Sequence, residues 1–385
     1  MNGAEDCRRI LVVGNGIAGQ TACDSLRAAG FDGSLTIVGD EPRTAYSRPA
    51  LSKALLVDGG SPELAPPLHR ATELLGTAAV GLDVESRRVH LDDGTDLPYD
   101  GLVIASGSRA RRLGGPESTK STEKTESTEL TLRTLDDAWV LRERLAAQPS
   151  VVVVGAGPLG MEIASAALSS GCEVTLVADG RPMLSHLGPH LSRAFTATAI
   201  AQGLTIVDGS AARIDAPREV ILRDGSRIEA DLIVTAIGDI PNTEWLATSA
   251  LTTDGHLEAD SRGRIRPNIV AAGDVAAIPT RRGVRRIPLW SSAIEQAKAA
   301  AVALLSGDDA PELDLDPYFW TEQFGLNLKA TGHLPVSGEP KFLVGERPEG
   351  PSVMRWTHDD GHGVAVAVNH RIAIPRLRRM ASATR

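Results

Sequence analysis

Residues 10–19 read ILVVGNGIAG, and residues 150–160 read SVVVVGAGPLG. Each stretch consists of an aliphatic run, a glycine-rich loop and the start of a helix-forming sequence. One such loop can arise by chance, but two in the same strand-loop-helix context indicate two bound dinucleotides. The sequence therefore predicts an α/β protein with two Rossmann-like dinucleotide-binding domains, between which electrons pass.

The first loop has a glycine wherever a dinucleotide-binding turn needs one. Gly14 permits the tight turn, Gly16 lets the backbone approach a pyrophosphate, and Gly19 lets the following helix pack closely. We predict a helix from Ala18 to Ala28, with its free N–H groups and its dipole directed at the phosphates. The alternative interpretation is an ordinary glycine-rich turn.

An acidic pair follows the next predicted strand, residues 34–38. Asp40 and Glu41 stand about twenty residues beyond the loop, where an acid is expected to bind a ribose hydroxyl. We expect Glu41 rather than Asp40 to have this role. The alternative is that both are surface acids.

The second loop repeats the pattern, and its predicted cofactor-binding residues are Gly155, Gly157, Pro158, Leu159 and Gly160. Pro158 falls in the first helical turn, where its missing N–H costs little. The strand predicted over residues 173–177 is followed by Asp179 and Arg181. An acid at this place favours the free ribose hydroxyl of NAD, whereas a base accommodates the extra phosphate of NADP. We expect NADH, with NADPH less favoured, although Arg181 blurs the choice.

Length and charge limit the class of protein. A chain of 385 residues is too long for a single core and is expected to form two or three domains. The net charge is −9, and no uninterrupted apolar stretch reaches the roughly eighteen residues of a membrane span. The start, MNGAEDCRRI, leads directly into the first strand, so we expect no signal peptide and a cytoplasmic location. Neither a membrane nor a nucleic acid is expected as a partner.

Cysteines and histidines add no further redox or metal site. Cys7, Cys23 and Cys172 are isolated, without the CxxC spacing of a redox disulfide. His186, His190, His358 and His362 are interpreted as loop or turn residues. We therefore predict no metal centre and no disulfide relay.

Several motifs together resemble one family. Residues 46–53 read YSRPALSK, which is similar to the YxRPxLSK segment of the FAD-dependent NADH:ferredoxin reductases that serve cytochromes P450 and ring-hydroxylating oxygenases, the putidaredoxin-reductase-like group. The further matches are LVIASG at 102–107, TLDDA at 134–138, DLIVTAIGDIPN at 231–242, AAGD at 271–274, Trp290 with EQA at 295–297, and PYFWTEQ at 317–323. The resemblance covers nearly the whole chain and implies a glutathione-reductase-like fold with a small α+β C-terminal domain.

The resemblance also assigns cofactor-binding residues. It implies that the first unit binds FAD, with Glu41 on the adenosine ribose, Arg48 and Lys53 beside the cofactor, and Asp274 on the ribityl chain. Lys53 would stabilise charge that develops on the flavin ring. Ala105, Gly107 and Gly238 are the other cofactor-binding residues that lie in matched segments. A capping role is the alternative for Asp274.

Two further residues are candidates for the catalytic site with Lys53. Glu162 matches an acid near the nicotinamide, although a salt bridge on the helix surface is an equal alternative. Trp290 is expected to pack on the flavin, or else to be a core tryptophan. The sequence departs from the family at Ala178, where an acid is usual, and at Pro288, where a glutamate is common.

These matches predict three domains. The FAD-binding domain takes residues 1–113 and 243–307, and the NAD(P)H-binding domain takes residues 114–242, with a polar linker at 114–129. Residues 315–385 form the C-terminal domain. Within the first two domains, Asp92-Asp93-Gly94 and Arg223-Asp224-Gly225 are typical of hairpin turns.

The resemblance implies a reductase that passes electrons from NADH through FAD to a [2Fe-2S] ferredoxin, which supplies a P450 or another oxygenase. An arginine cluster at 281–286 or at 371–379 would attract an acidic ferredoxin, or is simply a solvated face. One alternative is a flavin NADH oxidase or a small-molecule dehydrogenase without a ferredoxin. The other alternative is a non-catalytic protein that resembles the apoptosis-inducing flavoproteins.

Overall fold

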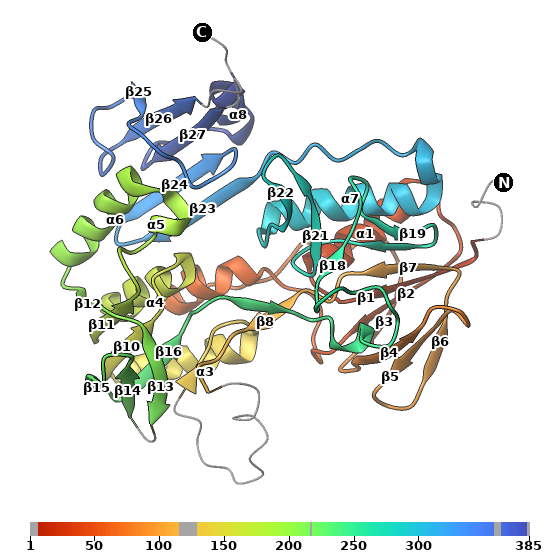
Figure 1. Ribbon diagram of the computed structural model, residues 1–385, viewed down its shortest axis with the longest axis horizontal. Coiled ribbons are helices and arrows are strands. Elements are labelled where there is room, and N and C mark those ends of the chain that lie inside the picture. The colour runs from red at the N-terminus through yellow and green to blue at the C-terminus, as the bar shows by residue number, and fades with distance from the viewer. Residues whose placement is uncertain (1–6, 115–128, 216–217, 358–362, 383–385) are drawn as a thin grey trace. The chain divides into compact units, whose positions relative to one another are not determined.

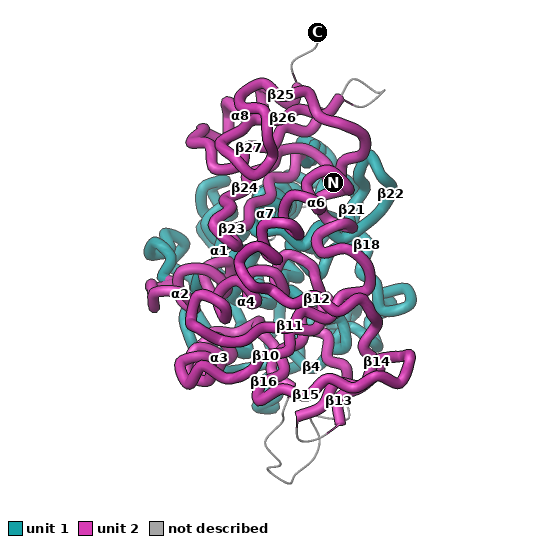
Figure 2. The backbone as a smooth tube through the Cα atoms, turned by 90° about the vertical axis from the view of Figure 1, so that its left-hand side faces the viewer, with its two compact units in different colours: residues 1–47, 63–109, 240–315 teal, residues 48–62, 110–239, 316–385 magenta. Residues whose placement is uncertain are grey.

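The computed structural model describes residues 7–114, 129–215, 218–357 and 363–382. The chain forms two compact units, coloured separately in Figure 2. Unit 1 comprises residues 1–47, 63–109 and 240–315, and unit 2 comprises residues 48–62, 110–239 and 316–385. Residues 115–128 of the predicted linker, and the pair His358 and His362, lie outside the described residues. The division into three domains stays a prediction.

Unit 1 is built on a six-stranded sheet that is mainly parallel. In spatial order its strands are β19 (Arg264–Arg266), β20 (Ile269–Ala271), β7 (Gly101–Ile104), β1 (Arg9–Val13), β2 (Ser34–Gly39) and β3 (Thr72–Leu75). The central strands are aliphatic and buried because both faces of this sheet are covered.

Alternate residues of β1 enter two different cores in unit 1. Ile10 and Val12 pack with helices α1 (Ile17–Ala28) and α7 (Trp290–Ser306), which lie together in Figure 1. Leu11 and Val13 face the opposite core. That core is completed by the sheet of β4 (Ala79–Asp83), β5 (Arg88–Leu91) and β6 (Asp96–Pro98) and by the short helix η4 (Glu244–Leu246).

The rest of unit 1 follows β20. Strands β18 (Leu257–Glu258), β21 (Ala276–Thr280) and β22 (Gly283–Arg286) form a small sheet, and η5 (Gly307–Asp309) follows α7. The chain passes between the units within β8 (Ser108–Ala110) and β17 (Asp239–Pro241).

Unit 2 contains a five-stranded parallel sheet with the same plan around its centre. Its strands, in spatial order, are β12 (Thr205–Asp208), β11 (Glu173–Ala178), β10 (Ser150–Val154), β16 (Leu232–Thr235) and β9 (Glu129–Leu130). The helices are α3 (Leu135–Ala146), α4 (Pro158–Ser169), α5 (Leu184–Leu187) and α6 (Pro189–Ala201), and the added sheet is β13 (Ala211–Asp215), β14 (Glu219–Leu222) and β15 (Arg227–Glu229).

Residues 48–62 and the C-terminal residues 316–385 also belong to unit 2. The former is a run of short helical turns, η1 (Arg48–Ala50), η2 (Leu51–Leu55) and α2 (Leu56–Asp58). The latter form an antiparallel sheet of β23 (Tyr318–Gln323), β24 (Leu326–Thr331), β27 (Gly363–Val368), β26 (Ser352–Thr357) and β25 (Lys341–Val344), against which α8 (Ile374–Ser382) packs.

The predicted fold class is confirmed. Both loops connect a buried parallel strand to a helix, as the glycine pattern predicted. The two predicted hairpin turns are confirmed as well, because β5 pairs antiparallel with β6 and β14 with β15. Helix α3 begins after Thr134, whose side chain and backbone form a capping box with Asp137.

Candidate cofactor-binding and redox site

The first glycine loop has space for a phosphate beside Gly16 but no room for a side chain at Gly14 or Gly19. Gly14 has φ +115°, and a Cβ built on it would lie 2.1 Å from the carbonyl oxygen of Ala105. A Cβ on Gly19 would lie 1.9 Å from the oxygen of Gly14, whereas a Cβ on Gly16 would meet nothing within 4 Å. No side chain caps α1, which begins at Ile17. The exposed N–H groups and the open side at Gly16 fit the pyrophosphate of a dinucleotide.

The predicted ribityl-binding aspartate lies in a loop that packs on the start of α1. Gly273 has φ +82°, and a Cβ there would approach that of Ala18 to 2.9 Å. The Gly273 N–H donates to Oε1 of buried Gln296 at 3.0 Å. The hydroxyl of Ser108 donates to Oδ2 of Asp274 at 3.3 Å. These contacts hold the Asp274 carboxylate beside the first cradle.

The predicted ribose-binding acid follows the carboxyl end of β2. Glu41 accepts a hydrogen bond of 2.6 Å at Oε2 from the hydroxyl of Tyr46, whereas Asp40 is exposed. The phenol fixes the direction of the Glu41 carboxylate. Tyr46 is the first residue of the YSRPALSK motif, so this motif begins by orienting the acid of the first unit.

The second loop repeats the geometry of the first. Gly155 has φ +105°, and a Cβ on it would lie 2.4 Å from the oxygen of Ala236. A Cβ on Gly160 would lie 1.9 Å from the oxygen of Gly155. The imidazole of His186 lies 3.3 Å from a Cβ position on Gly157. The sequence-based prediction that His186 and His190 lie in a loop is wrong, because His186 lies in α5 and His190 in α6. The position of His186 beside the second glycine loop was also missed, since no local pattern indicates this contact.

The remaining predicted residues of the second unit surround this loop in sequence and in space. Pro158 is the first residue of α4, and half-buried Leu159 follows it. Asp179 and Arg181 are both exposed just after β11, at the same strand end as the loop. Gly238 has φ +100° and open space where a Cβ would lie.

A buried polar centre joins two predicted catalytic residues within unit 2. Glu162 of α4 is 4% exposed and pairs with Lys53 of η2, whose Nζ lies 2.9 Å from Oε2. The Ser52 hydroxyl donates to the same oxygen, and the Thr321 hydroxyl donates to Oε1 at 2.6 Å. The Trp320 ring lies 5.7 Å from the Lys53 ammonium. The carboxylate thus has donors from two distant segments and keeps a cation beside it in a site from which water is largely excluded.

Three other predicted residues lie outside this centre. Arg48 donates from Nη1 to the carbonyl of Arg133 at 2.8 Å within unit 2. In unit 1, half-buried Trp290 is the first residue of α7. Gly107 has φ +66°, and its carbonyl accepts the N–H of Asn242 at 3.0 Å. No contact in the structure tests the cofactor roles assigned to these residues, which stay predictions.

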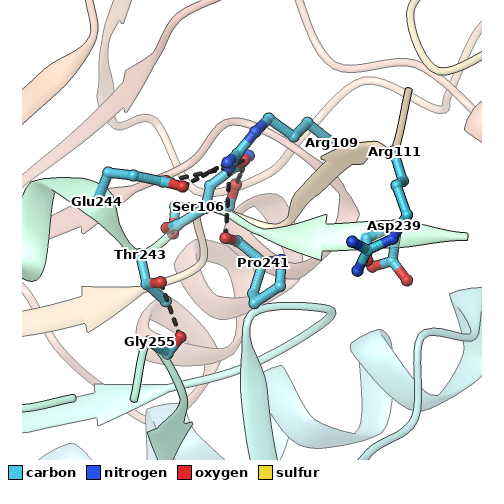
Figure 3. A network of polar contacts seen from close by, with 9 residues as sticks. Ser106, Arg109, Arg111, Asp239, Pro241, Thr243, Glu244 and Gly255 are labelled. Carbon is cyan, nitrogen blue, oxygen red and sulfur yellow. Dashed lines mark hydrogen bonds and ion pairs between the residues drawn. The ribbon is translucent and has the colours of Figure 1, made fainter. Parts of the chain in front are cut away.

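A second polar network in unit 1 was not expected from the sequence. Figure 3 shows Arg109 directed at the carboxylate of Glu244 and the carbonyl of Pro241. Ser106 exchanges two hydrogen bonds with Asn242: its Oγ donates to the Asn242 carbonyl at 2.8 Å, and Asn242 Nδ2 donates to the Ser106 carbonyl at 2.9 Å. This network fastens residues 106–109 to the stretch where the chain returns to unit 1.

The cysteines do not take part in either site. All three are free, and burial raises the pKa of the Cys7, Cys23 and Cys172 thiols. A raised thiol pKa disfavours the reactive thiolate. Over the described ranges, no group of three or more histidine, cysteine, aspartate or glutamate residues is arranged to hold a metal ion. In the same ranges, no helix has the length and apolar character that crossing a membrane requires.

Comparison with known proteins agrees with this geometry. Residues 8–297 match the family model described as pyridine nucleotide-disulphide oxidoreductase. The chain is 36% identical to rhodocoxin reductase of Rhodococcus erythropolis over 84% of its length and 78% of the relative. It is 32% identical to the ferredoxin reductase component of chlorobenzene dioxygenase from Cupriavidus sp. (strain PS12), over 94% and 89% of the two chains. A solved covalent complex of putidaredoxin reductase with putidaredoxin matches with a TM-score of 0.85 at 27% identity, over 97% of this chain and 93% of that one.

Proposed function

Because this chain belongs to the pyridine nucleotide-disulphide oxidoreductase family, we propose that it is an FAD-dependent reductase that transfers electrons from NADH to a [2Fe-2S] ferredoxin of an oxygenase or P450 system. The observation that carries the proposal is the pair of matching glycine cradles, each at the carboxyl end of a buried parallel strand and the start of an uncapped helix. The names of the relatives, which include ferredoxin reductase components of oxygenases, supply the acceptor.

Bound FAD would supply the ability to take two electrons together from NADH and give them up one at a time. The chain contributes binding and charge. The loop Gly14–Gly19 and the α1 terminus hold the pyrophosphate, and Glu41, oriented by Tyr46, accepts from the ribose hydroxyls. The loop Gly155–Gly160 and the α4 terminus bind the pyrophosphate of NADH in the same way.

The buried polar centre of unit 2 has a separate task in this proposal. The Lys53 ammonium lies beside Glu162, and the hydroxyls of Ser52 and Thr321 fix the carboxylate between them. A fixed cation next to the reacting groups stabilises negative charge that develops there without reorientation of solvent. We include Trp290 among the residues that contact the cofactor, since it stands half-buried at the start of α7.

A cytoplasmic location is part of the proposal. The three cysteines are free, which fits a compartment that keeps thiols reduced. We also include NADH rather than NADPH as the donor, with Asp179 as the acid after β11 that favours a free ribose hydroxyl.

The test is a set of kinetic measurements on purified protein. We expect the visible bands of an oxidised flavin, their rapid bleaching by NADH in stopped flow, slower bleaching by NADPH, and cytochrome c reduction that depends on added [2Fe-2S] ferredoxin. Protein that stays colourless after incubation with FAD would overturn the flavoprotein assignment. Oxygen consumption at the same rate with and without ferredoxin would favour an NADH oxidase instead.

A further inference from the structure

A buried histidine begins a one-way chain of hydrogen bonds beneath the first phosphate loop. His69 is 1% exposed and lies just before β3. Its Nδ1 accepts the N–H of Ala71 at 2.9 Å. Since a backbone N–H can only donate, the ring proton must be on Nε2, which lies 2.9 Å from Oε1 of Gln20. The imidazole is therefore neutral, and it donates to the glutamine.

The next two links follow from this tautomer. Because Oε1 of Gln20 accepts from His69, its amide nitrogen faces Asn15 and donates to Oδ1 at 2.5 Å. The Asn15 amide nitrogen then donates to Oε2 of Glu73 in β3 at 3.1 Å. Each amide has one possible orientation once the histidine tautomer is set, so the direction of the chain is fixed from end to end.

The chain passes through the loop predicted to hold FAD. Asn15 stands between Gly14 and Gly16, and its Cβ lies 2.6 Å from a Cβ position on Gly39, the last residue of β2. The side chain is thus wedged at the carboxyl end of β2, two residues before Glu41. Because Asn15 is held on both sides, the loop keeps its shape whether or not a phosphate is bound.

We propose that His69 is a positioning residue for FAD: its hydrogen bond to Gln20 sets Gln20 and Asn15 so that the first phosphate loop is preorganised. This inference rests on the proposed function, which places FAD on this loop. A side chain at position 69 that cannot donate to Gln20 leaves both amides free to turn, so FAD is then released faster.

The charged groups around His69 bind the backbone beside it or the far end of the chain. On α1, Arg27 donates from Nε to the carbonyl of His69 at 2.9 Å, and Asp24 accepts the N–H of Leu68 at 3.0 Å. On β3, Glu73 terminates the chain. The Arg27 guanidinium donates to backbone carbonyls, so it does not replace the bond from His69 to Gln20.

The experiment measures release of FAD from the holoprotein, as the rise in flavin fluorescence on dilution at a fixed pH. His69→Leu, which cannot donate to Gln20, and Gln20→Met, which has similar length but neither bond, should each release FAD about tenfold faster than the unaltered protein. His69→Gln, whose amide can still donate to Gln20, should restore most of the retention that His69→Leu loses. His90→Gln, a change at a half-exposed histidine of β5, should follow the unaltered protein.

The outcomes separate this inference from the proposed function. If His69→Gln releases FAD as fast as His69→Leu, or if Gln20→Met releases FAD at the unaltered rate, the positioning role is refuted while the flavoprotein stands. Gln20→Met keeps the test decisive even where the histidine variant does not fold, since methionine is a good helix former at this position of α1. Protein that never holds flavin would refute the proposed function itself.

Discussion

At the scale of single residues, Glu162 is the side chain on which most contacts of the buried polar centre of unit 2 converge. Its two carboxylate oxygens accept from Lys53, Ser52 and Thr321, and only 4% of the side chain is exposed. Both oxygens therefore have donors, and the single negative charge is balanced by Lys53. Such an arrangement fixes geometry at the cost of desolvating two ions, which is typical of a site kept for function rather than for stability.

Glu162→Gln should therefore be costly to the fold. The amide would leave the Lys53 ammonium, itself only 14% exposed, without a counter-charge. We expect the free energy of unfolding to fall by about 3 kcal/mol, measured by urea denaturation of the apoprotein. The double variant Lys53→Met with Glu162→Gln should recover part of this loss, because no buried charge remains.

Lys298→Ala is the matched control, since this lysine pairs with Glu295 on the surface of α7, with both side chains about half exposed. Removing that pair should cost less than about 0.5 kcal/mol. Equal losses in Glu162→Gln and Lys298→Ala would contradict the assignment of a buried, mutually dependent pair.

Residues that need a special backbone or a local neighbour were predictable from the sequence, and residues joined across the fold were not. The tight turn at Gly14 and the close packing at Gly19 agree with the structure, because both depend on a turn of six residues. Lys53 and Glu162 were each selected, but their pairing across 109 positions leaves no periodic signal. The same reason hid Arg109 with Glu244, and His69 with Gln20, since neither pair shares a motif.

At the scale of elements, each glycine cradle consists of a strand, a loop and a helix. A glycine in the helix packs directly on the carbonyl oxygen of the first loop glycine and so holds the three together. Gly19→Ala would force a Cβ to 1.9 Å from the Gly14 oxygen, so α1 must move away from β1. We expect a loss of roughly 2–3 kcal/mol in unfolding free energy, as for other overpacked sites, together with loss of FAD.

Gly16→Ala is the complementary change, because its Cβ meets no protein atom within 4 Å and the residue has φ −94°. The apoprotein should unfold within about 0.5 kcal/mol of the unaltered chain, while the methyl group takes the space of a phosphate and flavin content drops sharply. Normal flavin content in purified Gly16→Ala would show that the pyrophosphate binds elsewhere.

The ends of β1 and β7 are joined by an ion pair whose strength depends on pH. Asp100 accepts the N–H groups of Arg8 and Arg9 at 3.1 and 2.8 Å and the guanidinium of Arg9 at 2.9 Å. The side-chain hydrogen bond from Arg9 is the main cause that holds the pKa of Asp100 below its ordinary value. A lowered carboxylate pKa contributes stability that is present above the unfolded-state pKa and is lost as the pH falls through the folded-state pKa.

Asp100→Asn should accordingly destabilise the protein at pH 7 by about 1 kcal/mol, a value reduced by solvent screening of the half-exposed Arg9. The difference between the two proteins should shrink as the pH falls through the lowered pKa of the unaltered Asp100 carboxyl, below the ordinary value of 3.8. Thermal unfolding across this range checks the sign, and a difference that grows in acid would contradict it.

At the scale of the whole molecule, the chain is one plan used twice with different additions. In unit 1 the order β2-β1-β7 surrounds the first loop, and in unit 2 the order β11-β10-β16 surrounds the second. Each central sheet carries a three-stranded antiparallel sheet, β4–β6 in one and β13–β15 in the other. Repetition explains why two short glycine motifs were enough to predict the architecture, whereas the C-terminal sheet was predicted only through the family resemblance.

The charge of the whole molecule sets a condition on any acidic electron acceptor. A net charge of −9 repels such a partner, yet the β21–β22 hairpin carries four arginines, Arg281, Arg282, Arg285 and Arg286. The last of these donates from Nε to the carbonyl of Asp274 at 2.5 Å, so the hairpin is attached to the loop predicted to bind the ribityl chain.

If this hairpin steers a ferredoxin towards the flavin, kcat/KM for ferredoxin should fall about tenfold between roughly 50 and 500 mM salt, while reduction by NADH changes little. Arg285→Glu should lower kcat/KM for ferredoxin several-fold at low salt, and the same charge change at exposed Arg88 of β5 should not. Equal effects of the two substitutions would mean that only the total charge matters and that the hairpin is an ordinary solvated surface.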